Sequence, residues 1–347
     1  MMNDPFERYH CQMALPHFGE RAQQRLQKAH VLLVGMGGLG CPAAQYLVAA
    51  GIGTLSIVDD DLVSLSNLHR QILFTPADVG LPKVEVALKR LQEQNPATQI
   101  IPYHQRVTSS NVLDLIKDVD LVIDGTDNFE TKYLLNDACV LLGKPLVYGA
   151  IYQYEGQVSV WNVLQPDGTC TANYRDIFPD AEKAQIPNCT EGGVIPTLAG
   201  IVGCMQANET IKYLTNAADL LAGKLWMINM QDGKTQVIHL KKSTTKITTL
   251  PESVATITFH ELQHMEQGQY TLIDVRSREE HQAFHIGGEN IPLDELNHYL
   301  DTLSLAKPII FYCASGKRSA QAVRLIKNRF KGKTAFSLKG GVQGIKS

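Results

Sequence analysis

An apolar segment that runs into a glycine-rich turn and then into a helical segment constrains the fold of this chain more than any other feature. Residues 29–37 are mostly apolar, and residues 39–50 have the composition and spacing of a helix. Four glycines occupy the junction between the two: Gly35, Gly37, Gly38 and Gly40. Glycine at such a turn lets the backbone approach a phosphate closely, and the helix N-terminus offers unpaired N–H groups. The pattern predicts a nucleotide site at the end of a first strand; a turn that serves packing alone is the other interpretation.

The alternation of strand and helix continues to about residue 150. Further strands are expected at 54–59, 99–107, 120–125 and 145–150, and helices at 82–95, 109–118 and 128–143. Strands that alternate with helices predict βαβ units in a Rossmann-like α/β fold, a doubly wound and mostly parallel sheet. At residues 152–161 apolar and polar positions alternate, which predicts antiparallel strands appended to that sheet.

A polar segment at residues 241–253 has no apolar periodicity and is typical of a linker. It separates an expected first domain, residues 1–240, from a second, residues 254–347. In the second domain, short strands at 256–259, 271–276, 309–315 and 335–340 surround helices at 260–268, 278–285 and 317–330. This pattern predicts a small α/β domain.

Charge and cysteine use exclude several classes of protein. Lys and Arg number 32 against 35 Asp and Glu, a net charge of −3, which argues against a general nucleic-acid or membrane-surface binder. No apolar run approaches the ~18 residues of a membrane span, and the N-terminus lacks a signal-peptide layout, so we expect a cytoplasmic protein. The seven cysteines are scattered and none forms a C-x-x-C pair, which argues against both a disulfide framework and a paired-thiol zinc site.

Polar residues follow the ends of the later strands. Asp59 ends the second strand, where an acid can hold a ribose hydroxyl. Three further segments then follow: Ser66-Asn67-Leu68-His69-Arg70-Gln71, Gly80-Leu-Pro-Lys83 and Asp124-Gly-Thr-Asp127-Asn128. An enzyme that moves a hydride has little use for Arg70 and Lys83 near its pyrophosphate. One that cleaves a triphosphate needs cations on the phosphates and a carboxylate for Mg²⁺. The alternatives are that Arg70 and Lys83 are surface charges and that Asp127 caps a helix.

These motifs identify a family. VLLVGMGGLG, SNLHRQ, GLPK, DGTDN and the later NCTEGGV occur in the order found in the MoeB/ThiF/HesA adenylyltransferases, bacterial relatives of ubiquitin-activating enzymes, which the chain resembles over roughly residues 5–240. The resemblance implies that ATP adenylates the C-terminal Gly-Gly carboxylate of a small β-grasp sulfur-carrier protein. It also implies an ATP site lined by Gly38, Asp59, Ser66, Asn67, Leu68, His69, Arg70, Lys83, Asp127 and Asn128. In that site Asn67, Arg70 and Lys83 would contact phosphates, and Asp127 would hold Mg²⁺.

The chain departs from the family pattern at two places. Many relatives have two C-x-x-C pairs that bind zinc, whereas here the first pair is Cys170-Thr-Ala-Asn173 and the segment before the linker holds no cysteine. We therefore expect no zinc, and packing must hold this lobe. Relatives often begin RYxRQ, whose second arginine reaches ATP in the partner subunit of a homodimer. Cys11 stands at that position here, and Arg8 is our hypothesis for a substitute.

Two of the cysteines are candidates for chemistry. Cys189 ends a long polar stretch, residues 166–189, before an expected small-residue helix at 192–214. The helix dipole would lower the pKa of a thiol there, and the family resemblance makes Cys189 the candidate for a thioester or acyl-disulfide step with the carrier. A small residue that packs under the loop is the alternative.

Cys313 begins the second candidate site, Cys313-Ala-Ser-Gly316-Lys317-Arg318, between a strand and a helix. Such a loop can turn backbone N–H groups toward the sulfur, and the two adjacent cations would stabilise a thiolate or persulfide. A buried structural cysteine is the alternative. The loop and its flanking motifs resemble a rhodanese domain, which implies that Cys313 carries a persulfide and that Arg318 orders the loop.

Together the two halves predict ATP-dependent activation of a sulfur carrier followed by persulfide sulfur transfer, which gives a carrier thiocarboxylate. The small subunit of molybdopterin synthase is the favoured acceptor, and the thiamine sulfur carrier is the alternative. Two other functions stay open, an NAD-dependent oxidoreductase fused to a sulfurtransferase and a non-catalytic scaffold. The sequence does not identify the persulfide donor.

Overall fold

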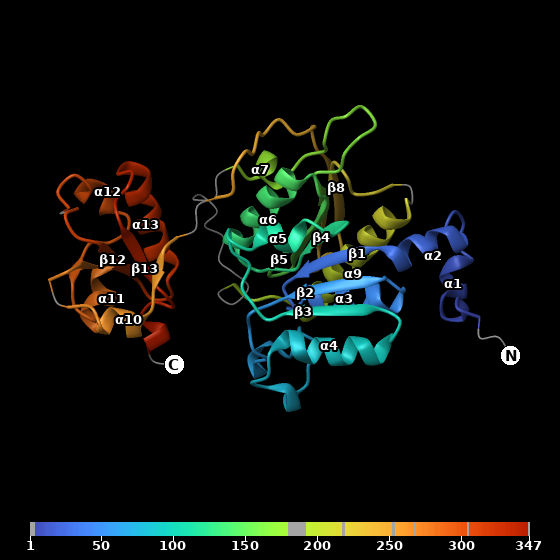
Figure 1. The fold of residues 1–347 in the computed structure, drawn as a ribbon, viewed down its shortest axis with the longest axis horizontal. Helices are drawn as coiled ribbons and strands as arrows, with labels where there is room; N and C mark the ends of the chain where they lie inside the picture. Colours follow the sequence, from blue (N-terminus) through green and yellow to red (C-terminus); the bar gives the residue numbers. More distant parts are fainter. Residues whose placement is uncertain are drawn as a thin grey trace. The chain divides into compact units, whose positions relative to one another are not determined.

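The computed structural model describes residues 4–179, 192–216, 219–251, 254–266, 268–303 and 305–345, except for the side chain of Lys317 (Figure 1). The chain divides into two compact units between Pro251 and Glu252. Each unit has its own sheet and its own hydrophobic cores. Among the described residues, no helix combines the length and the apolar character needed to cross a bilayer.

The first unit is built on an eight-stranded sheet in the order β3-β2-β1-β4-β5-β6-β7-β8. Its strands are β1 His30–Val34, β2 Thr54–Val58, β3 Gln99–Tyr103, β4 Leu121–Asp124, β5 Leu146–Tyr152, β6 Glu155–Trp161, β7 Lys224–Asn229 and β8 Thr235–His239. The first five run parallel, and β6, β7 and β8 pair antiparallel. The predicted doubly wound sheet with appended antiparallel strands is confirmed.

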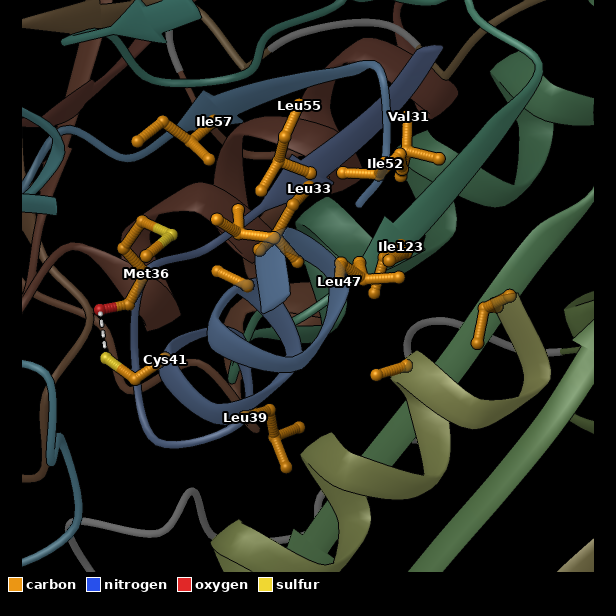
Figure 2. Close-up of a cluster of buried hydrophobic side chains, with 14 of the residues drawn as sticks. Val31, Leu33, Met36, Leu39, Cys41, Leu47, Ile52, Leu55, Ile57 and Ile123 are labelled. Carbon is orange, nitrogen blue, oxygen red and sulfur yellow. Dashed lines mark hydrogen bonds between the residues drawn. The ribbon is translucent and has the colours of Figure 1, made fainter. Parts of the chain in front are cut away.

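Helices cover both faces of this sheet. They are α1 His10–Met13, α2 Gly19–Lys28, α3 Gly40–Ala49, α4 Lys83–Gln94, α5 Val112–Ile116, α6 Phe129–Leu142, α7 Tyr174–Ile177 and α9 Pro196–Thr215. Side chains of a strand alternate between its two faces, and β1 shows both cores. Val31 and Leu33 join a core with α3, α4 and α9, part of which Figure 2 shows. Leu32 and Val34 join the core with α5, α6 and α7. Because β1 is buried on both faces, its C-terminal end is held firmly beneath the glycine turn.

In the described part of the polar stretch, residues 166–179, the chain forms the helical turn α7, which the lack of periodicity did not predict. Tyr174 starts α7 and is buried, with its ring 4.9 Å from that of Tyr133 and 5.3 Å from that of Tyr148. Asn173 and Asp176 form a capping box around the helix N-terminus. A single aromatic anchor and a local cap therefore order this turn, and neither produces a repeating pattern.

The second unit is a five-stranded parallel sheet in the order β11-β10-β12-β13-β9. Its elements are β9 Thr256–Ile257, α10 Phe259–Gln263, β10 Thr271–Asp274, α11 Arg278–Ala283, β11 Glu289–Asn290, α12 Leu296–Tyr299, β12 Ile309–Tyr312, α13 Lys317–Arg329 and β13 Ala335–Leu338. The central strand β12 is buried on both faces, with Phe311 in one core and Ile310 in the other. The predicted small α/β domain is confirmed, and the cysteine loop follows its central strand.

Candidate nucleotide site and cysteine loop

The glycine turn is tight and locks against the end of β4. Gly35 has φ +94°, which favours glycine, and a Cβ added there would lie 2.8 Å from the backbone of Gly125. A Cβ added at Gly40 would lie 1.9 Å from the Gly35 carbonyl oxygen. The sequence therefore needs glycine at both positions for α3 to begin so close to β1. The Cys41 thiol donates to the Met36 carbonyl inside this turn (Figure 2), and burial raises the pKa of Cys41 to about 12, so this thiol stays protonated.

Asp59 holds the turn from the end of β2. Its Oδ2 accepts the N–H of Met36 at 2.7 Å, and its Oδ1 accepts the N–H of Asp61 at 2.8 Å. Burial raises the pKa of Asp59, although the nearby Lys83 opposes that effect. The predicted ribose-binding carboxylate thus lies directly beside the glycine turn, and its binding role stays a prediction.

Lys83 is buried, with 3% of its side chain exposed. Its ammonium nitrogen lies 2.7 Å from Oδ2 of Asp61 and 3.9 Å from Oδ2 of Asp59. The alternative that Lys83 is a surface charge is wrong. Lys83 is the first residue of α4. A β-bridge between Leu62 and Pro82 brings the start of this helix back beside the segment that follows β2.

Arg70 lies over the glycine turn. A Cβ added at Gly38 would lie 3.4 Å from Cγ of Arg70, so these residues are in contact. Its Nη2 donates to Oδ1 of Asn67 at 2.7 Å, and its Nη1 lies 3.2 Å from Nε2 of His69. Nδ1 of His69 lies 3.0 Å from the Ser66 carbonyl oxygen, so the predicted cluster is one hydrogen-bonded loop.

Leu68 and Gln71 have a different place in that loop. Leu68 packs against the core and anchors the loop there. Gln71 is buried, its amide nitrogen lies 3.7 Å from a Cβ position built on Gly37, and its Oε1 meets no hydrogen-bond partner among the described residues. A buried acceptor without a partner is costly unless a ligand or water fills it. The SNLHRQ motif gives no role for Gln71, because a single amide carries no pattern of its own.

The turn after β4 carries the remaining predicted residues. Asp127 is exposed. Oδ1 of Asn128 accepts the N–H of Thr131 at 2.9 Å and caps α6. The alternative that Asp127 is the helix cap is therefore wrong, and its carboxylate is left at the surface of the turn. Asn128 is predicted to bind nucleotide, but its side-chain oxygen Oδ1 is engaged in the cap.

Three consecutive carboxylates form a second acidic group beside the turn. Oxygens of Asp59, Asp60 and Asp61 all lie within 4.8 Å of one another. Sequence reasoning assigned Mg²⁺ to Asp127 and not to this group. Backbone N–H groups and Lys83 already engage Asp59 and Asp61.

Hydrogen bonds connect two segments of the lobe that includes Cys170. The N–H of Ser243 donates to the carbonyl of Cys170, and the amide of Asn173 donates to the Ser243 hydroxyl at 2.8 Å. Oδ1 of Asp176 accepts the Thr245 hydroxyl at 2.6 Å and the N–H groups of Thr244 and Thr245. We refer to Asn173, Asp176 and residues 243–245 as the polar clasp. It joins the stem of the long loop to the segment that ends the first unit.

Three predicted features remain to be placed. Cys189 lies outside the described residues. Cys11 is exposed, and the Arg8 guanidinium donates to the carbonyl of Gln94 at 2.9 Å. The substitution of an arginine finger by Arg8 stays a hypothesis.

Cys313 follows β12 directly and is 1% exposed. The N–H of Gly316 points to its sulfur at 3.1 Å, and the Ser319 hydroxyl oxygen lies 3.5 Å from it. The loop ends where α13 begins, so the positive end of the helix dipole also faces it. From behind, the N–H of Val342 donates to the Cys313 carbonyl, and a Cβ added at Gly341 would lie 2.3 Å from that oxygen. Burial suits a structural cysteine, whereas the Gly316 N–H aimed at the sulfur suits a thiolate.

Arg318 forms a bidentate ion pair with Glu280 of α11. Its two terminal nitrogens lie 2.6 and 2.7 Å from the two carboxylate oxygens. The hydrogen bonds from Arg318 lower the pKa of Glu280 to about 2. Arg318 therefore joins the start of α13 to α11. This contact is compatible with the prediction that Arg318 orders the cysteine loop.

The fold and these sites define a nucleotide-binding α/β protein followed by a unit with a cysteine loop. The chain matches the model of the ThiF family over residues 9–249 and that of the rhodanese-like domain over residues 260–347. It belongs to the ThiF family and carries a rhodanese-like domain. The resemblance drawn from the motifs is confirmed.

Curated relatives match most of the chain. The chain is 45% identical over 241 residues to the sulfur carrier protein adenylyltransferase of Thermus thermophilus, covering 69% of this chain and 89% of that protein. It is 38% identical over 363 residues to the probable adenylyltransferase/sulfurtransferase MoeZ of Mycobacterium tuberculosis, covering 96% and 91%. It is 36% identical over 382 residues to the adenylyltransferase and sulfurtransferase MOCS3 of Drosophila grimshawi, covering 99% and 84%.

Solved structures share the fold of the first unit. A crystal structure of E. coli MccB with ATP superposes with a TM-score of 0.56 at 20% identity, over 65% of this chain and 67% of that one. PaaA gives the same TM-score and identity over 69% and 75%. At this identity the likeness supports the fold alone.

Proposed function

We propose that this protein uses ATP to adenylate the C-terminal Gly-Gly carboxylate of a small β-grasp sulfur-carrier protein, and that Cys313 then delivers sulfur to give a thiocarboxylate. The observation that carries the proposal is the Lys83 ammonium, buried beside Asp59 at the sheet edge that holds the glycine turn. The printed names of the Thermus and Mycobacterium relatives, an adenylyltransferase for a sulfur carrier and an adenylyltransferase/sulfurtransferase, support it.

In the adenylation step the carrier carboxylate attacks the α-phosphorus of ATP, and pyrophosphate leaves. The carboxylate is already ionised at pH 7, so no general base is required. Charge repulsion and alignment set the barrier, and positioned cations can lower it. Arg70, which lies over Gly38, and the buried Lys83 are the cations that we assign to the phosphates, with Asn67 orienting Arg70.

Two carboxylates have separate assignments. Asp59, which is fixed by two backbone N–H groups, is our candidate for the ribose hydroxyls. The exposed Asp127 is the carboxylate that we assign to Mg²⁺, which would neutralise phosphate charge there. The unpartnered Oε1 of buried Gln71 supports a polar ligand beside Gly37.

The sulfur step uses a persulfide on Cys313. Its terminal sulfur attacks the acyl carbon, AMP leaves, and the carrier is joined to Cys313 through an acyl disulfide. A second thiol then reduces that disulfide and releases the thiocarboxylate; Cys189 is the candidate named from the sequence. The Gly316 N–H and the dipole of α13 would stabilise the sulfur anion.

The finer expectations belong to the same proposal. We infer that the metal is Mg²⁺, that no zinc is bound, and that the enzyme acts in the cytoplasm as a homodimer with an external persulfide donor. Gel filtration and metal analysis test the dimer and the absence of zinc.

Intact mass spectrometry of candidate carriers tests the central claim. The molybdopterin-synthase carrier and the thiamine carrier are each incubated with ATP, Mg²⁺ and the enzyme. A gain of one AMP on one carrier supports the proposal and names the substrate. No gain on either carrier, with carriers that a known adenylyltransferase does modify, would overturn it. Unchanged nicotinamide fluorescence on titration with NADH would dispose of the oxidoreductase alternative.

A further inference from the structure

A buried ion pair that the adenylation step does not use lies at the end of β4. Nζ of Lys132 lies 2.9 Å from Oδ2 of Asp124, and the two side chains are 6% and 1% exposed. Removing two charges from water costs several kcal/mol per ion in general, so such a pair is weak evidence for stability. A buried pair at the edge of a candidate site is therefore a candidate for a role in the geometry of that site.

The two oxygens of Asp124 have separate partners. Oδ2 accepts from Lys132, whereas Oδ1 accepts the N–H of Thr126 at 3.0 Å and its hydroxyl at 2.6 Å. Lys132 also donates to the Gly149 carbonyl at 2.8 Å. The ammonium thus fixes the Asp124 carboxylate against β5, and the carboxylate fixes Thr126.

The backbone on the other side of this turn is fixed as well. The N–H of Gly125 donates to the Val34 carbonyl at 2.8 Å, and a Cβ added at Gly125 would lie 2.8 Å from the Gly35 carbonyl oxygen. The Gln206 amide donates to the Asp124 carbonyl at 2.7 Å. The turn after β4 is therefore held directly against the glycine turn.

Asp127 stands between two anchored residues. Thr126 precedes it, bonded twice to Asp124, and Asn128 follows it as the cap of α6. Because both neighbours are held, the backbone of Asp127 has little freedom, while its own side chain is exposed. The hydroxyl of Thr126 is the short side-chain link in this arrangement.

We propose that Thr126 is a positioning residue that, anchored by the buried Lys132–Asp124 pair, sets the carboxylate of Asp127 toward the phosphates and their metal. This inference rests on the proposed adenylation and adds to it a residue that acts through its neighbour Asp127. Loss of the Thr126 hydroxyl weakens the use of Mg²⁺ while the buried ion pair remains intact.

Thr126→Val and Thr126→Ser in the full chain test this role. Valine keeps the shape and removes the hydroxyl donor, whereas serine keeps the donor. Carrier-dependent exchange of pyrophosphate into ATP is measured against Mg²⁺ concentration. We expect Thr126→Val to raise the half-saturating Mg²⁺ concentration about tenfold, on the scale of one charge-assisted hydrogen bond, and Thr126→Ser to stay within about twofold of the wild type. Thr235→Val, an exposed position on β8, is the matched control.

The outcomes separate this inference from the proposed function. If the wild type catalyses exchange and Thr126→Val shows the same Mg²⁺ dependence as the wild type, the inference is overturned and the proposed function is not. An equal loss in both variants, with lowered unfolding midpoints, assigns Thr126 to folding and also overturns it. No exchange by the wild type with any carrier overturns the proposed function and the inference with it. Lys132→Met is not used, because it would leave the buried Asp124 carboxylate without its cationic partner and destabilise the fold.

Discussion

Burying a lysine ammonium is costly unless carboxylates compensate for the water that it loses. Lys83 meets this condition at the edge of the sheet, with Asp61 at 2.7 Å and Asp59 at 3.9 Å. Asp61 is largely exposed, so this pair can open to admit a phosphate without leaving both groups buried and unpaired. The burial of Lys83 thus keeps a cation beside the glycine turn, and its exposed partner leaves it available.

Replacing Lys83 tests that role at the scale of one residue. Methionine preserves much of the volume and removes the charge, so we expect Lys83→Met to slow carrier-dependent exchange of pyrophosphate into ATP by roughly 10²- to 10³-fold. Lys89→Met is the matched control, because Lys89 is an exposed lysine of the same helix. An exchange rate within twofold of the wild type for Lys83→Met would remove Lys83 from the phosphate site.

The Arg318–Glu280 pair makes a prediction about pH. Arg318 lowers the pKa of Glu280 from 4.5 to about 2, so the pair stabilises the fold above about pH 4.5 and loses its contribution as the pH falls toward 2. Glu280→Gln should therefore lower the unfolding temperature of the second unit at pH 7, and the difference from the wild type should shrink toward pH 2. Calorimetry of the full chain at several pH values measures it, with the exposed Glu289→Gln as control. A difference that does not change with pH would contradict the assignment.

Sequence reasoning at this scale reached the side chains that recur in motifs and missed those that act alone. Lys83 and Arg70 were named because cations follow strand ends. Gln71 was not assigned, since an orphaned buried acceptor is visible only in three dimensions. Asp127 and Asn128 are adjacent, and both residue types cap helices well, so only the structure shows that Asn128 is the cap.

At the scale of elements, burial decided what the sequence could predict. The parallel strands β1, β2 and β4 are buried on both faces and stand out as apolar runs. Strand β8, Thr235–His239, is exposed at every position, so no core imposes a pattern on it. Its partner β7 is mostly half-buried, and neither strand was predicted.

The polar clasp stabilises its lobe through hydrogen bonds between two segments of the chain. Oδ1 of Asp176 accepts three hydrogen bonds from Thr244 and Thr245, so we expect Asp176→Ala to lower the free energy of unfolding of the first unit by roughly 1 to 2 kcal/mol. Urea denaturation measures this loss. Asp167→Ala is the control, since Asp167 pairs with Lys242 at the surface, where such pairs contribute little. Equal losses in both variants would show that the clasp has no special part in stability.

The polar clasp lies in the lobe for which the sequence predicts no zinc. Asn173 occupies the position at which the family pattern has a second cysteine, and its amide donates to Ser243 across the lobe. The clasp joins Asn173 and Asp176 to residues 243–245, which lie at the start of the predicted linker. The sequence predicts that packing holds this lobe, and Ala172 and Tyr174 are buried in the core with α5, α6 and α7. The polar clasp adds hydrogen bonds to that packing, and the absence of zinc stays a prediction.

At the scale of the whole molecule, two sites with different chemistry belong to units with separate sheets and cores. The candidate nucleotide site has cations and carboxylates at the carboxyl ends of strands in a mixed sheet, whereas the cysteine loop has an N–H donor beside its sulfur at the end of a strand in a parallel sheet. Neither sheet shares a strand with the other. A variant that loses sulfur transfer should therefore keep adenylation, and the reaction should stop at an intermediate.

Cys313→Ser tests this separation. Serine is close in size to cysteine and can accept the Gly316 N–H, so the loop should keep its shape, but it cannot carry a persulfide. We expect the variant to release pyrophosphate with the carrier at the wild-type rate and to accumulate the carrier as its adenylate. The wild type, supplied with a persulfide donor, should exchange one carrier oxygen for sulfur. Intact mass spectrometry distinguishes these products, and the exposed Cys11→Ser is the control.

Each alternative result of that experiment has one meaning. Thiocarboxylate formed by Cys313→Ser at the wild-type rate would remove Cys313 from the sulfur step. If Cys313→Ser loses both pyrophosphate release and sulfur transfer, the activity of the first unit depends on the cysteine loop. Accumulated adenylate alone fits two units in which Lys83 and Arg70 activate the carboxylate and Cys313 supplies the sulfur.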